Sequence, residues 1–216
     1  MGYVVKALTG LFFVCMAYGV QAQEQDYPNQ AAYDVVQTAT DNLINQITGK
    51  RELYREDTEL FFADVDEMLS DVIDFKRIAR RVMAKHYKKA EPEQQRAFEV
   101  AFKRSLMKVY AKALLEYNNE RIEILPPLNT DKADSKRQRV DIEFFSDGGR
   151  KIPISYSMYL NKDKQWKMEN VVVNGVNIGL TYRNQFARSM KVNQNDIDKV
   201  IASWTSDVES TELSAK

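Results

Sequence analysis

The spacing of apolar residues changes once along this chain, near Tyr117. Before that point, apolar side chains recur every three or four residues, which is the period of an amphipathic helix. The pattern predicts helices over residues 30–47, 58–70 and 75–83, with Asp74 as the N-cap of the third. Beyond Tyr117 the apolar positions alternate with polar ones, which is typical of half-buried strands.

A longer helix is predicted from Pro92 to Tyr117, because proline is favoured in the first turn of a helix. Its apolar stripe repeats every four residues: Phe98, Phe102, Leu106, Tyr110 and Leu114. At about 100° per residue, the stripe winds by roughly 160° about the helix axis over that distance. The two ends of the stripe therefore need different neighbours, so we expect a central helix or one wall of a shared cavity.

Alternating segments over residues 121–125, 139–144, 152–160 and 165–173 predict a meander of antiparallel strands. The alternation slips at Asn170, which predicts a β-bulge that curves the sheet. Two short helices are expected at 180–190 and 196–204. The fold class is therefore α+β: a curved antiparallel sheet of about four strands packed against helices, with an N-terminal helical subdomain.

The composition excludes several classes of function. The chain has 216 residues, 44% of them hydrophobic, with 31 basic and 31 acidic side chains, so no global positive charge attracts nucleic acid. One His and one Cys are too few for a disulfide framework or a Cys/His zinc site. Nucleotide-binding glycine loops and the G-x-S-x-G elbow are also missing from the sequence. We therefore expect no catalytic residue, metal or cofactor, and interpret His86 as a surface or half-buried histidine.

Residues 1–22 predict a secretory signal peptide. Lys6 precedes an apolar run that ends in the small-residue exit Val20-Gln21-Ala22, and the run is shorter than the roughly 20 residues that span a bilayer. A membrane anchor and a lipoprotein attached at Cys15 are the alternatives. Cleavage after Ala22 would remove the only cysteine and give an exported, thiol-free mature chain. At the other end, residues 207–216 are expected to be a flexible tail.

Charges are segregated in one part of the chain. Residues 56–74 contain eight acids and no base, and seven bases then precede the next acid, Glu91. One interpretation is a basic patch that contacts a lipid headgroup or an acidic partner through Arg77, Arg80, Arg81 and Lys85. The alternative is that two adjacent helices neutralise each other as solvated faces.

Three segments resemble the motifs of a known family. The first contains Asp74-Phe75 with Ile78, Ala79, Arg80 and Val82, and the second is the long-helix run from Gln95 through Phe98, Phe102, Leu106, Tyr110, Ala111 and Leu114 to Tyr117. The third contains Trp166-Lys167, Val171 to Val173, Gly175-Val176-Asn177-Ile178, Tyr182-Arg183 and Gln185-Phe186. In their order and spacing these segments resemble the MlaC family, also called the toluene-tolerance auxiliary component. Ala84 departs from the family pattern, which usually has glycine there, and Glu91 replaces a common Ser or Thr cap.

The resemblance implies a periplasmic phospholipid carrier with an NTF2-like sheet and a helical subdomain. It would be a monomer that carries lipid between an outer-membrane lipoprotein and porin complex and an inner-membrane MCE-domain ABC transporter, and so maintain outer-membrane lipid asymmetry. Phospholipid would be its cargo. The family domain would cover about residues 23–206, with a helical part at 30–117, the sheet at 120–174 and C-terminal helices at 178–205.

Acyl chains would be enclosed by the inward face of the sheet and by helical residues. The lipid-binding residues we predict are Phe75, Ile78, Leu106, Tyr110, Val140, Ile142, Phe144, Ile154, Tyr156, Met158, Val171, Val173, Tyr182 and Phe186. For each of them the alternative is ordinary core packing.

Two other functions stay open at this point. An NTF2-like pocket could host an isomerase or dehydratase that uses Asp141 with Tyr156, Tyr159 or Tyr182. A periplasmic adaptor or chaperone could use an exposed apolar groove.

Overall fold

A computed structural model describes residues 30–118, 120–126, 136–146 and 149–211 of the chain. The N-terminal half is helical: α1 (Gln30–Gly49), α2 (Arg51–Glu56), α3 (Thr58–Ser70), α4 (Phe75–Met83), the 3₁₀ helix η1 (Ala84–Lys89) and α5 (Pro92–Glu116). The strands follow, β1 (Ile122–Ile124), β2 (Arg137–Phe145), β3 (Lys151–Leu160), β4 (Trp166–Val173) and β5 (Val176–Asn177), and then α6 (Ile178–Val192) and α7 (Ile197–Thr211). The predicted α+β class is confirmed.

At the two ends of the chain, the predicted segments and the described residues overlap only in part. The predicted signal peptide, residues 1–22, lies outside the described residues. Helix α7 continues to Thr211, whereas the sequence pattern predicts its end near Trp204. The predicted tail, residues 207–216, therefore overlaps the last turns of α7, and residues 212–216 lie outside the described part.

Side-chain caps fix the start of three helices. The carboxylate of Asp57 accepts a hydrogen bond from the Leu60 amide at 2.9 Å, and that of Asp74 accepts from the Arg77 amide at 2.8 Å. The side chain of Asn177 caps α6 by accepting from the Leu180 amide at 3.0 Å. Each cap satisfies an amide that has no partner within its helix, which stabilises the boundary.

The five strands form one antiparallel sheet in the order β1-β2-β3-β4-β5. The predicted bulge is confirmed, because Ser157 pairs with Asn170 whereas Met158 pairs with Met168. Glu169 is the extra residue between these two pairs, and the bulge changes the register of the ladder there. The fifth strand was not predicted, since two residues are too few to show alternation.

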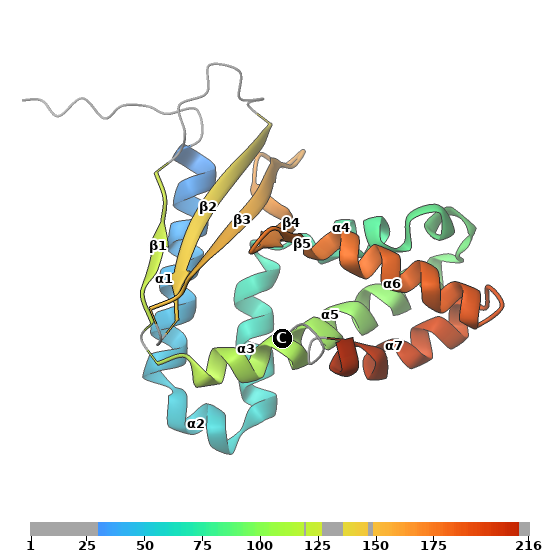
Figure 1. Ribbon diagram of the computed structural model, residues 1–216, viewed down its shortest axis with the longest axis horizontal. Helices are drawn as coiled ribbons and strands as arrows, with labels where there is room; N and C mark the ends of the chain where they lie inside the picture. Colours follow the sequence, from blue (N-terminus) through green and yellow to red (C-terminus); the bar gives the residue numbers. More distant parts are fainter. Residues whose placement is uncertain (1–29, 119, 127–135, 147–148, 212–216) are drawn as a thin grey trace, which may run out of the picture.

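Three separate hydrophobic cores hold the fold together (Figure 1). The first joins α4, α5, α6 and α7, which extend to the right in this view. The second lies between α1 and the sheet, where Ala32 and Val36 pack with Val140, Ile142 and Met158. The third joins α1, α2, α3 and α5 near the base. Helix α5 crosses the molecule and contributes to the first and third cores.

The largest side chains of the first core are aromatic. Trp204 is fully buried, and its ring centroid lies 5.1 Å from that of Phe98 and 5.9 Å from that of Phe186. Phe98 and Phe186 meet edge to face at 4.8 Å. Edge-to-face pairs at such distances add to the energy of simple area burial, so these rings stabilise the packing of α5, α6 and α7.

Ala84 ends α4 in a conformation that suits glycine. Its φ is 50° and its ψ is −120°, a region that side chains with a Cβ rarely adopt. This is the position where the resembled family usually has glycine. The alanine therefore stores backbone strain at the junction of α4 and η1.

Replacing Ala84→Gly is expected to increase the free energy of unfolding by about 1 kcal/mol, since relief of strain exceeds the added entropy of the unfolded chain. Urea denaturation of the lipid-free protein measures the change. Ala101→Gly, inside α5, is the matched control and should lower the same quantity by about 1 kcal/mol. Equal destabilisation by both substitutions would contradict the assignment of strain to Ala84.

Candidate functional site

An apolar cavity of about 410 Å³ lies where the three cores meet. This volume falls within the roughly 300–1,000 Å³ typical of ligand pockets. The cavity is lined by Leu43, Leu69, Ile73, Phe75, Ile78, Phe102, Leu106, Met107, Tyr110, Leu114, Ile154, Tyr156, Met168, Asn170, Val171, Val173, Ile178, Gly179 and Tyr182. Among these described residues none is charged, and Asn170 and three tyrosines carry the polar side-chain groups.

The cavity exists because the cores do not merge. Ile78, Leu106 and Ile178 are partly buried against the helical core, whereas Ile154, Tyr156 and Met168 are partly buried against the core under α1. Leu43, Leu69 and Leu114 border the third core in the same way. Each core thus ends in a row of half-buried apolar side chains, and these rows face one space.

Helix α5 serves the two roles that its stripe predicted. Phe98 packs fully into the helical core, whereas Leu106, Tyr110 and Leu114 line the cavity. Phe102 does both, since it is buried in the core and also reaches the cavity wall. The winding of the stripe is what allows a single helix to support a packed core at one end and a ligand-sized space at the other.

The wall of the cavity is of low polarity. The phenol of Tyr156, on β3, lines the cavity, and burial raises its pKa above the usual value near 10. Burial in a medium of low polarity disfavours the charged phenolate, which is the physical cause of this shift. A space with such a wall suits hydrocarbon better than it suits an ion.

Nine of the predicted lipid-binding residues lie in this wall: Phe75, Ile78, Leu106, Tyr110, Ile154, Tyr156, Val171, Val173 and Tyr182. The structure brings them together from α4, α5, β3, β4 and α6. Whether they contact lipid stays a prediction.

The other five lie elsewhere. Val140, Ile142 and Met158 share the inward face of the sheet with the lining residues, but they are buried in the core under α1. Phe186 is fully buried in the helical core. Phe144, on β2, pairs with Ile122 of β1 near the sheet edge. Val140, Ile142 and Met158 pack in that core instead of the cavity wall because α1 covers the β2 side of the sheet. Phe186 packs within the helical core, and Phe144 lies near the sheet edge, so neither lines the cavity.

Several lining residues were missed by the sequence prediction. Leu43, Leu69, Ile73, Met107 and Ile178 belong to ordinary amphipathic patterns, which do not show what covers an apolar face. Met168 was visible as part of the β4 alternation, and Asn170 as the residue where it slips. No sequence pattern indicated that Gly179 lines the cavity.

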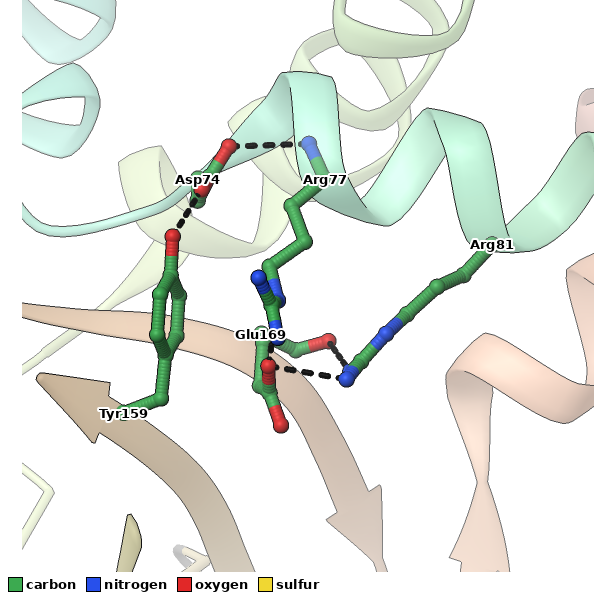
Figure 2. A network of polar contacts seen from close by, with 5 residues as sticks. All are labelled: Asp74, Arg77, Arg81, Tyr159 and Glu169. Carbon is green, nitrogen blue, oxygen red and sulfur yellow. Dashed lines mark hydrogen bonds and ion pairs between the residues drawn. The ribbon is translucent and has the colours of Figure 1, made fainter. Parts of the chain in front are cut away.

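A polar cluster fastens α4 to β4 beside the cavity (Figure 2). The Arg77 Nε lies 2.5 Å from a carboxylate oxygen of Glu169, and an Arg81 terminal nitrogen lies 2.8 Å from the same oxygen. Arg81 also donates to the backbone carbonyl of Glu169 at 3.3 Å. The Glu169 side chain is only 7% exposed, so the bulge places a buried carboxylate between two arginines.

The same cluster includes an aromatic contact. The Arg77 guanidinium lies 4.0 Å from the centre of the Tyr159 ring, and the Tyr159 hydroxyl donates a hydrogen bond to Asp74. Burial and this hydrogen bond raise the pKa of Tyr159 to about 12. Because α4 carries Phe75 and Ile78, the cluster also holds one wall of the cavity in place.

Glu169→Gln is expected to lower the free energy of unfolding by about 1–2 kcal/mol. Loss of a fully buried ionic partner would cost more, but the arginines are 34% and 43% exposed and water compensates them in part. Urea denaturation measures the change. Glu143→Gln, which breaks a pair with the 54% exposed Lys151, is the control and should cost less than about 0.5 kcal/mol. Equal losses of unfolding free energy in Glu169→Gln and Glu143→Gln would contradict a structural role of the cluster.

The structure separates the four predicted basic residues into different environments. Arg77 is held by Glu169 and Tyr159, and the Arg80 guanidinium lies 5.5 Å from the centre of the Tyr87 ring. Arg81 and Lys85 line a second hollow next to the cavity. From the preceding acidic stretch, Asp64 pairs with Lys50 at 2.8 Å and Asp66 pairs with Lys103 at 2.6 Å. Both charged stretches thus make specific ion pairs with other elements.

His86 lies in η1, where its ring centroid is 5.9 Å from that of Phe186. Burial lowers its pKa below the usual value near 6.5, and the charges of Lys85 and Lys89 lower it further. The neutral ring is therefore favoured in the folded protein. Its half-buried position agrees with a packing role.

The only histidine of the chain makes this shift easy to measure. We expect the His86 ring proton to titrate by NMR with a midpoint below 6.5 in the folded protein and near 6.5 in urea. Since the unfolded chain binds the proton more readily, the stabilisation is complete above pH 6.5 and is lost as pH falls through the lowered pKa. His86→Gln should remove this part of the pH dependence. A folded midpoint above 6.5 would contradict the environment described.

The groups proposed for an enzyme pocket are not assembled around one space. Tyr156 and Tyr182 line the cavity, but Asp141 pairs with Ser155 on the opposite face of the sheet and accepts a hydrogen bond from it. Tyr159 is bonded to Asp74. Within the described ranges, no group of three or more His, Cys, Asp or Glu side chains could hold a metal ion. No helix in those ranges is both long enough and apolar enough to cross a membrane.

Comparisons with known proteins indicate the family of the chain. A family model described as MlaC protein matches residues 37–206. The chain is 39% identical over 180 residues to the toluene tolerance protein Ttg2D of Pseudomonas putida, covering 83% of this chain and 82% of that protein. It is 23% identical over 175 residues to the intermembrane phospholipid transport system binding protein MlaC of Haemophilus influenzae, covering 80% of each.

A solved structure shares the fold. It is the phospholipid-binding protein from Ralstonia solanacearum in complex with a phospholipid, with a TM-score of 0.73 and 24% sequence identity. The similarity covers 82% of this chain and 98% of that one.

Proposed function

The chain belongs to the MlaC family, and from this premise we propose that it is a periplasmic phospholipid carrier that holds acyl chains in the cavity between its three cores. The observation that carries the proposal is the uncharged, ligand-sized cavity itself. The names of the Haemophilus and Ralstonia proteins, which state phospholipid transport and phospholipid binding, support the choice of ligand.

The physical need for such a cavity follows from the cost of exposing lipid to water. Burial of a methylene group is worth about 0.8 kcal/mol, so exposure of roughly 30 methylenes would cost on the order of 20 kcal/mol. An apolar cavity removes most of this barrier. Because the donor bilayer is also apolar, small differences in affinity suffice for loading and release, and no covalent step is required.

The protein also gains from an apolar ligand. An apolar cavity leaves the side chains of its wall without contacts on one side, and this loss of contacts lowers stability. Hydrocarbon in this space would restore the missing contacts, so ligand binding and stability are expected to be coupled.

In the proposed cycle the exported chain, cleaved after Ala22, receives lipid at one membrane and delivers it at the other. Its partners would be an outer-membrane lipoprotein and porin complex and an inner-membrane MCE-domain ABC transporter. A carrier of this kind would act as a monomer and would help maintain outer-membrane lipid asymmetry. N-terminal sequencing of the exported chain should begin at Gln23.

Lipid transfer between vesicles tests the proposal. Donor vesicles contain a self-quenched fluorescent phospholipid, acceptor vesicles contain none, and dequenching reports transfer. We expect the initial rate to rise in proportion to the concentration of the mature protein. The Val171→Trp variant, in which the cavity is filled, should give at most about a tenth of that rate. Transfer no faster than without protein would contradict the carrier function, and equal transfer by the variant would contradict the use of this cavity.

A further inference from the structure

A second hollow adjoins the apolar cavity and differs from it in charge. It measures about 600 Å³ and shares Ile78, Asn170 and Gly179 with the cavity wall, so the two spaces meet at these residues. We call this hollow the vestibule. Its other polar and charged lining residues are Arg81, Lys85, Ser157, Glu169, Asn177 and Arg183.

The boundary between the two spaces is a close approach of α6 to β4. The Gly179 amide donates to the side-chain oxygen of Asn170 at 3.2 Å. A Cβ at position 179 would lie 2.4 Å from that oxygen, so residue 179 must be small for this contact. Asn170 comes directly after the bulged residue Glu169. The bulge therefore places the polar side chain of Asn170 where the cavity meets the vestibule.

The vestibule has an excess of positive charge. It is lined by three cations, Arg81, Lys85 and Arg183, against the single carboxylate of Glu169. That carboxylate is 7% exposed and already lies 2.5 Å from Arg77 and 2.8 Å from Arg81. Lys85 and Arg183 are exposed and come from separate elements, η1 and α6. A group at the end of the cavity would therefore meet a positive surface.

We propose that the vestibule binds the phosphodiester of the lipid whose acyl chains occupy the cavity, with Arg183 and Lys85 as its main ligands. The inference rests on the proposed function, because an amphiphile with its chains in the cavity must place its polar end where the cavity becomes polar. Arginine offers a planar pair of donors that matches phosphate oxygens, and lysine adds a point charge. Hydrogen bonds to an ionised group are about twice as strong as neutral ones, so the vestibule selects phospholipids over neutral glycerolipids.

The test compares two lipids with the same chains, dioleoyl phosphatidylglycerol and dioleoylglycerol. Binding to the delipidated mature protein is measured by competition with a fluorescent fatty acyl probe. The double variant Arg183→Gln/Lys85→Gln should lose at least about tenfold in affinity for the phospholipid while its affinity for dioleoylglycerol changes less than about twofold. The control Lys88→Gln/Lys89→Gln removes the same charge from exposed positions of η1 and should change neither affinity.

The other outcomes distinguish the phosphate subsite from the carrier function. Unchanged phospholipid affinity in the Arg183/Lys85 variant, or equal losses for both lipids, overturns the phosphate subsite and leaves the carrier function standing. Failure of the wild-type protein to bind either lipid overturns both. Inorganic phosphate, added alone, should compete with phosphatidylglycerol only at concentrations at least about a hundredfold higher, since it gains nothing from the cavity. If inorganic phosphate competed as well as phosphatidylglycerol binds, the subsite would be specific for free phosphate and not for the phosphodiester of a lipid.

Discussion

Replacing Val171→Trp is expected to lower the phospholipid that copurifies with the protein at least about tenfold while the fold persists. Val171 and Val173 both line the cavity, and Val171 pairs with Tyr156 at the centre of its sheet wall. An indole at this position fills space that the acyl chains would use. Overpacking a fitted apolar space costs about 1–3 kcal/mol, and 2 kcal/mol, in the middle of this range, corresponds to a loss of affinity of roughly thirtyfold.

The adjacent residue supplies the matched control. Val172 pairs with Ser155, on the opposite face of the same strand, and is absent from the cavity wall. Val172→Trp should therefore leave the molar ratio of phospholipid to protein within about 20% of the wild-type ratio. Phosphate analysis of a solvent extract gives this ratio, and circular dichroism checks the fold. Equal loss in both variants would indicate a general effect of tryptophan on β4, and retention in Val171→Trp would place the lipid elsewhere.

Trp204→Ala is expected to reduce the free energy of unfolding by about 3–5 kcal/mol, the largest stability effect of any substitution considered. Trp204 is fully buried against Phe98 and Phe186, and its indole nitrogen donates to the Ser105 hydroxyl at 3.2 Å. Removal of the ring leaves a large void and a buried hydroxyl without that donor. Both effects lower stability.

Urea denaturation of lipid-free wild-type and variant proteins measures this loss, because bound lipid would shift the two curves unequally. Trp204→Phe retains most of the apolar volume and should cost about half as much or less. A loss below about 1 kcal/mol in Trp204→Ala would show that α7 contributes little to the helical core, contrary to the packing described.

The sequence predicted the elements whose patterns are long. The stripe of α5 and the alternation of β3 and β4 each extend over eight or more residues, and their boundaries agree closely with the structure. The slip at Asn170 correctly located the bulge. Among the elements of six residues or fewer, β1 was predicted, whereas α2, η1 and β5 were not, because they are too short for a period to be read.

The cavity wall was predictable only in part, since alternation shows which side of a strand is apolar and not what covers it. Val140 pairs with Tyr156 on the same sheet face, yet Val140 packs in the core under α1 and Tyr156 lines the cavity. The difference is the position of α1, which depends on contacts between distant parts of the chain. The vestibule shows the same limit, because Lys85 and Arg183 are almost a hundred residues apart and meet only in the fold.

Photocrosslinking from the cavity wall tests most directly whether acyl chains occupy the space between the three cores. A benzophenone amino acid is introduced in place of Tyr110, a lining residue of α5 that is 39% exposed, and the exported protein is irradiated before purification. The same substitution at Val100, which is 65% exposed on the same helix and outside the cavity wall, is the control. We expect a mass increase of one phospholipid for the Tyr110 position and none for the Val100 position. No lipid adduct at Tyr110, or equal adducts at both positions, would show that the acyl chains lie elsewhere.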